Sequence, residues 1–122
     1  MLRPLLTAAS VGVLALPLAA SGSPIKPVLT AKVTATSISL VDENGRRVER
    51  LQQNEYRFVV KDLTVRQNFH LIGPTVNLRT KVPVKTTTSW SVYLEPGRYT
   101  YRSDRSSILR RTFVVRPGPP PA

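Results

Sequence analysis

Few residues of this chain could carry out chemistry, and they lie in two short stretches. One stretch contains the single histidine, His70, and the other contains the adjacent pair Ser103-Asp104. Serine, histidine and aspartate are the residue types of a hydrolytic triad. No nucleophile-elbow motif accompanies them, however, and adjacent residues of an extended chain point to opposite faces. The seven carboxylates form no recognisable acid–base pair, and glycine-rich phosphate loops are missing. We therefore expect a protein that is not an enzyme.

The stretch around Ser103 predicts a strand, a short loop and a closing strand. Tyr99, Tyr101 and Ser103 alternate on one face of the first strand. After a break, the alternation resumes at Phe113 and Val115. Ser103 is therefore expected to point into the core, and the loop that follows it is expected to carry whatever function this end of the chain has.

Alternating apolar and polar residues predict the other strands. Trp90 is expected to anchor the core, and Asn68 and His70 are expected to share one strand face. The turn Asn44-Gly45 favours a hairpin with a charged edge strand as its return arm. The expected strand regions are residues 31–40, 46–50, 55–61, 67–72 and 88–94. Together with the two strands around Ser103, they indicate an all-β Greek-key sandwich of about seven to eight strands.

The two ends of the chain are expected to lie outside this domain. Residues 1–21 combine an early positive charge, an apolar run and small residues, which is typical of a signal peptide cleaved near Ala20-Ser21. An uncleaved N-terminal anchor is the alternative. Residues 22–30 read as a linker, 31–116 as the domain and 117–122 as a proline-rich flexible tail. The protein is therefore expected to be secreted, extracellular or periplasmic.

Two motifs resemble the cupredoxin-like, plastocyanin-type family of small secreted β-sandwiches. One is Asn68-Phe-His-Leu-Ile-Gly-Pro74, and the other is Glu95-Pro-Gly-Arg-Tyr-Thr-Tyr101, which follows the tryptophan strand. The resemblance extends over residues 31–115. In that family the loop between the last two strands carries copper ligands of the types Cys, His and Met. The resemblance implies that these ligand positions fall here on Ser103, Ser106 and Leu109, so that His70 is the one ligand-type residue left.

The residues present argue against copper. A type 1 copper centre needs a thiolate and two imidazoles, and the chain has no cysteine and one histidine. We therefore expect no cofactor and no disulfide-linked partner, although a weakly bound metal ion at His70 stays open. The resemblance leaves one alternative function, a copper-binding electron-transfer protein of the cupredoxin family.

Charge is the remaining functional signal. The formal net charge is +11, which attracts anions and repels other cations. If the family fold holds, many basic residues cluster at the former copper end, and we expect them to bind anions. These residues are Arg66, Arg79, Lys81, Arg102, Arg105, Arg110 and Arg111.

The expected function is accordingly a non-catalytic binding or structural module. Its partners would be an anionic cell-envelope polymer, lipid head groups or an acidic protein. Nucleic acid is not expected, because the chain has no recognition motif for it. The alternative is a solvated basic surface that only keeps the protein soluble.

Overall fold

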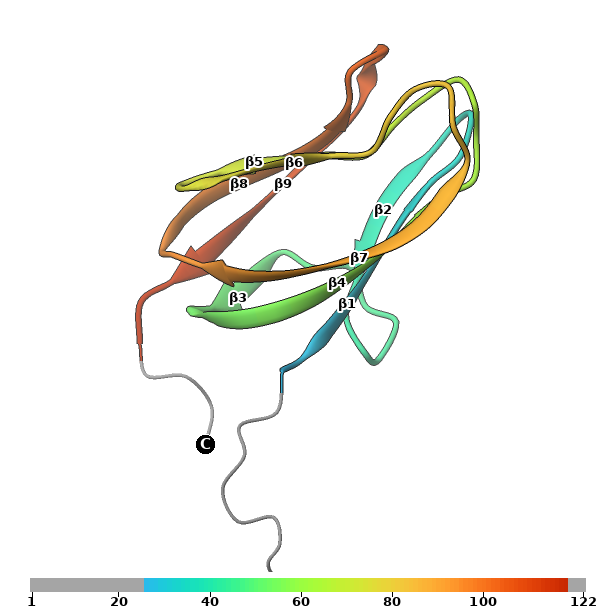
Figure 1. The fold of residues 1–122 in the computed structure, drawn as a ribbon. Helices are drawn as coiled ribbons and strands as arrows, with labels where there is room; N and C mark the ends of the chain where they lie inside the picture. Colours follow the sequence, from blue (N-terminus) through green and yellow to red (C-terminus); the bar gives the residue numbers. More distant parts are fainter. Residues whose placement is uncertain (1–25, 119–122) are drawn as a thin grey trace, which may run out of the picture.

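The computed structural model describes residues 26–118, which form two β-sheets packed face to face (Figure 1). The first sheet has the order β2-β1-β4-β7 and the second the order β3-β9-β8-β5-β6. The strands of the first sheet are β1 (Val28–Val33), β2 (Ile38–Val41), β4 (Asn54–Asp62) and β7 (Thr86–Leu94). Those of the second are β3 (Arg50–Gln52), β5 (His70–Gly73), β6 (Val76–Arg79), β8 (Gly97–Ser103) and β9 (Ser106–Arg116). The predicted all-β sandwich is thus confirmed, with nine strands among the described residues.

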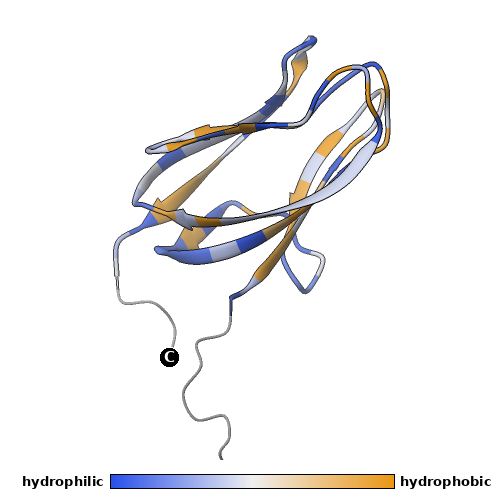
Figure 2. Cartoon of the chain, viewed as in Figure 1, coloured by the Kyte–Doolittle hydropathy of each residue, from blue (hydrophilic) through white to orange (hydrophobic). Residues whose placement is uncertain are grey.

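The core lies between the sheets and follows the alternation read from the sequence. In β4 the buried residues Tyr56, Phe58 and Val60 alternate with more exposed neighbours. Figure 2 shows the same change of hydropathy from one residue to the next along the strands. Across the second sheet, Tyr99 stacks on Phe113 with ring centroids 5.2 Å apart. Aromatic side chains therefore provide much of the core.

Trp90 occupies a more peripheral place than its sequence context predicts. It is only partly buried, and its ring contacts Phe69 at a centroid distance of 6.2 Å. The five largest fully buried side chains are instead Tyr99, Tyr101, Phe58, Phe69 and Phe113. The prediction that Trp90 anchors the core is therefore wrong, and the aromatic residues of β8 and β9 have that role.

Two buried tyrosines each donate a hydrogen bond to a backbone carbonyl that lies two residues before the start of their own strand. The Tyr56 hydroxyl donates a hydrogen bond to the Gln52 carbonyl at 2.6 Å. The Tyr99 hydroxyl donates one to the Glu95 carbonyl at 2.8 Å. Each bond satisfies a polar atom in the core and fixes where its strand begins.

Some element boundaries differ from the prediction. β1 begins at Val28, inside the expected linker 22–30, because residues 28–33 pair in parallel with β4. The turn after β2 forms, with Gly45 at a φ of 80°, but its return arm makes a single bridge, Val41 to Arg47. The chain then crosses to the other sheet, where β3 pairs with β9. Residues 67–69 precede β5 and lie outside the strand.

The predicted signal peptide, residues 22–25 of the predicted linker and residues 119–122 of the predicted tail lie outside the described residues. Within residues 26–118 no helix is long and apolar enough to cross a membrane.

Candidate functional site

The turn between β8 and β9 contains only two residues, Asp104 and Arg105, because β9 already begins at Ser106. Ser103 and Ser106 are direct partners in the hairpin. Leu109 is 7% exposed and belongs to the hydrophobic core. The short loop expected from the sequence is thus a two-residue turn, but the expectation that inward-facing residues resume only at Phe113 is wrong, because Leu109 is already buried within β9. The three residues at the family's ligand positions therefore belong to a tight hairpin and do not converge on one point.

Ser103 points inward as predicted, and its hydroxyl is fully engaged. The side chain is buried, and the hydroxyl donates to Gln67 Oε1 at 2.7 Å. It accepts from the backbone N–H groups of Arg105 at 3.1 Å and of Asn68 at 3.3 Å. This hydroxyl ties the turn to the segment before β5.

His70 is buried, and both of its ring nitrogens have partners. Nδ1 lies 2.8 Å from Oδ1 of Asp104, which accepts a hydrogen bond from the ring. Nε2 lies 2.6 Å from Oδ1 of Asn77, across the β5–β6 hairpin. A histidine can bind a metal only through a nitrogen with a free lone pair, and neither nitrogen is free here.

Asp104 is the centre of this cluster. Oδ2 accepts a hydrogen bond from Asn68 Nδ2 at 2.9 Å, and the Asp104 N–H donates to Asn68 Oδ1 at 2.7 Å. Arg79 and Arg102 approach the carboxylate at 3.6 and 3.7 Å. Burial opposes ionisation of Asp104, but the bonds from Asn68 and His70 and the charges of His70 and Arg102 outweigh it. The pKa of Asp104 therefore lies below its ordinary value.

A buried carboxylate, that of Asp62, is linked to this cluster through Asn68 and Thr80. Asn68 Nδ2 also donates to the Thr80 carbonyl at 3.0 Å. The Thr80 hydroxyl donates to Asp62 Oδ2 at 2.9 Å and accepts from the Phe69 N–H at 2.9 Å. Burial raises the pKa of Asp62, although hydrogen bonds from Thr80 and Thr64 act in the opposite direction. Asp62 and Thr80 could not be identified from the amino-acid pattern, because each is a single polar residue at a strand end.

These donors do not fit the copper that the family resemblance implies. Type 1 copper needs a thiolate with two free imidazole nitrogens, whereas this end offers a hydrogen-bonded hydroxyl and a histidine with both nitrogens engaged. Among the described residues, no group of three or more His, Cys, Asp or Glu side chains could hold a metal ion. The side chains at this end form a hydrogen-bond network around Asp104.

The candidate anion-binding residues fall into neighbouring groups. Arg79, Lys81 and Arg105 line one recess beside Asp104, with a volume of about 440 Å³. Arg102 and Arg110 are direct partners across β8 and β9 and line a smaller recess of about 230 Å³.

The other two candidates lie apart from these groups. Arg111 faces the opposite side of β9 from Arg110, toward Tyr101. Arg66 lies in the loop between β4 and β5, and none of the recesses described here includes it.

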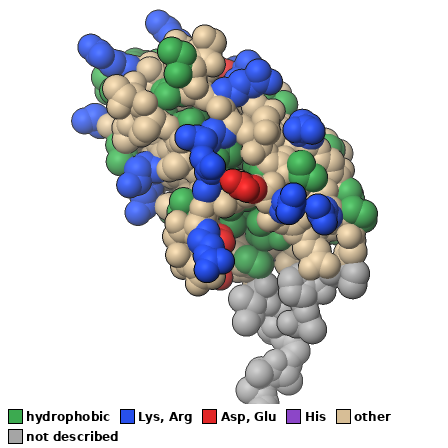
Figure 3. Space-filling model, turned by 180° about the vertical axis from the view of Figure 1, so that it is seen from behind, with side chains coloured by type: hydrophobic (Ala, Val, Ile, Leu, Met, Phe, Trp, Pro, Cys, Tyr) green, Lys and Arg blue, Asp and Glu red, His purple; other side chains and the backbone are tan. Residues whose placement is uncertain are grey.

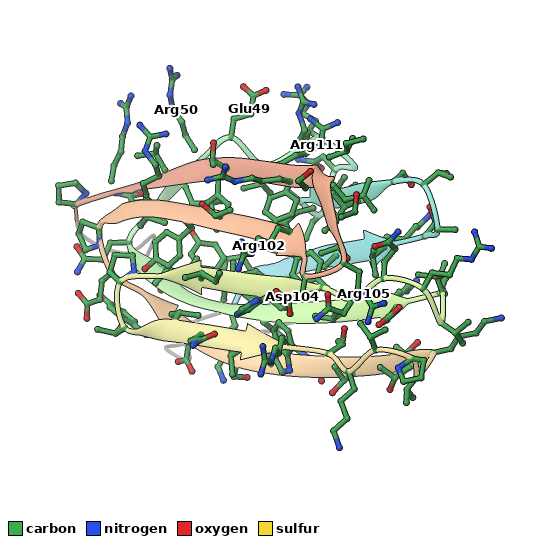
Figure 4. All side chains as sticks on the ribbon, turned by 90° about the horizontal axis from the view of Figure 1, so that it is seen from above. Glu49, Arg50, Arg102, Asp104, Arg105 and Arg111 are labelled. Carbon is green, nitrogen blue, oxygen red and sulfur yellow. The ribbon has the colours of Figure 1, made fainter. Side chains whose placement is uncertain are left out.

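The figures show the same separation. In Figure 4, Arg102, Asp104 and Arg105 lie around the turn, while Arg111 lies along the other edge with Glu49 and Arg50. Figure 3 shows Lys and Arg side chains spread over a whole face of the molecule, with few acidic ones between them. The basic surface therefore extends well beyond the turn.

Comparison with known proteins supports the fold. No family model and no curated protein sequence matches the chain. Among solved structures, the copper-containing nitrite reductase of Thermus scotoductus overlaps 83% of this chain with a TM-score of 0.51 and 15% sequence identity. The overlap covers 25% of the reductase chain, so this chain spans about a quarter of its length. This likeness shows that the chain has a cupredoxin-like fold.

Two amicyanin variants also overlap with the chain. An oxidised methionine-to-leucine variant overlaps 75% of this chain and 92% of its own, with a TM-score of 0.46 and 14% identity. A reduced tryptophan-to-tyrosine variant overlaps 80% and 88%, with a TM-score of 0.43 and 14% identity.

Proposed function

We propose that this cupredoxin-like chain is an exported, copper-free and non-catalytic binding module that holds an anionic polymer of the cell envelope. The observation that carries the proposal is the way the turn is built. Asp104 is engaged by His70 and Asn68, while Lys81 and Arg105 line the same recess and make no ion pair with a described residue. Export is supported by the apolar N-terminal segment of the sequence.

The network gives this end a fixed shape, which favours binding. A rigid sandwich that presents loops is a common arrangement for recognition, because the binding groups are held in place before the ligand arrives. Each exposed charge pair contributes only about 0–1 kcal/mol, so several basic residues must act together on a polymer. Binding should therefore weaken as salt screens charges beyond a Debye length of about 8 Å at physiological ionic strength.

The test compares two triple variants of equal charge. The first replaces Arg66, Lys81 and Arg105 with glutamine, which removes loop residues that make no ion pair with a described residue. The control replaces Lys32, Arg57 and Arg98, which are exposed on β1, β4 and β8, with glutamine. Both lower the net charge by the same amount, so a general charge effect would treat them alike.

Retention on a polyphosphate matrix in a salt gradient is the measurement. We expect the loop variant to elute at clearly lower salt than the parent, and the control variant to elute close to the parent. Equal losses in the two variants would mean that the whole basic surface acts through net charge, and retention unaffected by salt would exclude an electrostatic partner. Arg110 and Arg111 are left unchanged because both line a further recess, next to Tyr101, which is separate from the one that Lys81 and Arg105 line.

A further inference from the structure

A recess opens between the two sheets on the side where β2 faces β9. Its volume is about 400 Å³. The residues from 47 to 49 line one wall, those from 110 to 112 line the other, and Tyr101 lies at its base. It is separate from the Asp104 turn, and Figure 4 shows Glu49 and Arg111 together on this edge of the molecule.

The Tyr101 hydroxyl is the one fully buried side-chain polar atom within residues 26–118 that has no hydrogen-bond partner. The ring is held in the core by stacking on Phe69 at a centroid distance of 5.5 Å. The other two buried tyrosines, Tyr56 and Tyr99, both donate to backbone carbonyls. An unpartnered buried hydroxyl costs about 1–3 kcal/mol, so this one calls for an explanation.

The surroundings of this hydroxyl are cationic. Burial raises the pKa of Tyr101, while the charges of Arg111 and Arg47 act to lower it, as does a backbone hydrogen-bonding group of Leu40 that lies outside hydrogen-bond geometry. The net direction is upward, so at neutral pH the hydroxyl keeps its proton and can donate it. A donor that faces two guanidinium groups lacks an acceptor, and an anion would provide one.

The arginines are held in place by neighbouring groups. Arg111 is the direct partner of Tyr101 across β8 and β9, and its Nε donates to the Ile38 carbonyl on β2 at 3.4 Å. That bond leaves both terminal nitrogens of Arg111 without a described protein partner. Arg47 is paired with Glu49 at 3.2 Å, and the Glu49 side chain is 70% exposed. Three arginines, the third being Arg110 at the rim, thus face one largely solvated carboxylate.

We propose that this recess binds a small oxyanion, a phosphate or carboxylate group, through the Tyr101 hydroxyl and the guanidinium groups of Arg111 and Arg47. Guanidinium groups match both kinds of oxyanion with paired N–H donors, and the hydroxyl supplies the donor at the base. The inference does not depend on the proposed function. Its central residue, Tyr101, carries no charge, and the loop residues Arg66, Lys81 and Arg105 lie outside the recess.

The test is an NMR titration of the full chain with inorganic phosphate and, separately, with acetate, at constant ionic strength set with chloride. We expect saturable shifts at the Arg111 Nε–H and at the amides of residues 47–49 and 110–112. The ion that binds more tightly shows whether the recess prefers a phosphate or a carboxylate group. Shifts that do not saturate, or that spread equally over the arginines of the whole surface, would overturn the proposal.

Conservative variants distinguish a specific anion site at Tyr101 from non-specific electrostatic binding to the basic surface. Tyr101→Phe should weaken binding of the stronger ion roughly fivefold to tenfold, because one hydrogen bond to an ion is lost. Its melting temperature should not fall, because no protein hydrogen bond is removed. Tyr99→Phe is the matched control and should leave binding unchanged while it lowers the melting temperature.

A second pair of variants tests the guanidinium group. Arg111→Lys keeps the charge but removes the planar fork, and it should also weaken binding severalfold. Arg105→Lys at the turn should have no effect. Undiminished binding in Tyr101→Phe and Arg111→Lys would reject the site, even if the polyphosphate experiment succeeded. Equal losses of polymer retention in the two triple variants would reject only the proposed function.

Discussion

Asp104, in the β8–β9 turn, forms a hydrogen bond with His70. Oδ1 of the carboxylate lies 2.8 Å from Nδ1 of the ring. The two residues are 34 positions apart in the sequence, and their contact joins the β8–β9 hairpin to β5. The second nitrogen of the ring is engaged by Asn77. His70 is therefore a structural residue of this network.

Asp104→Asn should destabilise the protein by about 1–3 kcal/mol at neutral pH, because hydrogen bonds of an ionised carboxylate are lost. The pKa of Asp104 is lowered in the folded state, so its stabilising effect is present above the ordinary aspartate pKa of about 3.9. That effect is lost as the pH falls through the folded-state pKa. Urea unfolding of both proteins at several pH values should show their difference shrinking in acid. A difference that stays constant from neutral pH into strong acid would contradict this account.

Asp62 should affect stability in the opposite direction, because burial raises its pKa. The folded state then favours the protonated form, so stability is lost as the pH rises from about 3.9 through the folded-state pKa. In Asp62→Asn this loss is absent, and the stability of the variant relative to the parent should improve as the pH rises from 4 toward 7. The slope of that difference, measured by urea unfolding, is the relevant quantity. A flat or falling difference would show that Asp62 is not desolvated.

Restoring the thiol should not restore a copper centre. Ser103→Cys supplies the missing ligand type, but the turn stays short and His70 stays bonded to Asp104 and Asn77. Titration of the variant with Cu(II) should therefore give no intense blue absorption band. The double variant Ser103→Cys, Ser106→His should behave in the same way, because residue 106 pairs within the hairpin. A blue product from either variant would show that the turn can open around a metal.

Removal of the two large aromatic side chains should have unequal effects. Phe113→Ala should cost about 3–5 kcal/mol, because Phe113 is fully buried and stacked on Tyr99. Trp90→Ala should cost less than about 3 kcal/mol, because Trp90 is only partly buried. Denaturant midpoints of both variants provide the comparison. If the two costs prove equal, Trp90 packs more deeply than its contacts indicate.

Alternation in the sequence was sufficient to predict most of the core. It predicted a strand at residues 55–61, which lies within β4, and it placed Tyr99, Tyr101 and Ser103 on the inner face of β8, where the structure has them. It failed at the start of β9. There Ile108 is 87% exposed. Residues 110–112 are all polar and exposed, whichever face of the strand they lie on. The inner face of this part of the strand borders a recess. It therefore lacks the alternating apolar residues from which a buried strand face is predicted.

The network around Asp104 could not be predicted for a different reason. Asn68 and Asp104 are 36 positions apart, and single polar residues give no periodic signal. The sequence identified Asn68 and His70 through a motif and Ser103 through alternation, but it did not show that they meet at Asp104. Which basic residues share a recess also depended on the strand register, which sets Arg102 opposite Arg110 and Arg111 opposite Tyr101.

The positions of the two ends of the described chain, residues 26 and 118, determine where the protein can be coupled to a label or a surface without covering the turn. Figure 1 shows that β1 starts and β9 ends at the same end of the sandwich, and that the β8–β9 turn projects from the other. A label, a bead or a fused domain joined at either end would therefore stand about the length of the sandwich away from Asp104 and Arg105. Attachment at residue 26 or 118 should leave the turn facing the solution, whereas coupling through surface lysines would include Lys81 beside it.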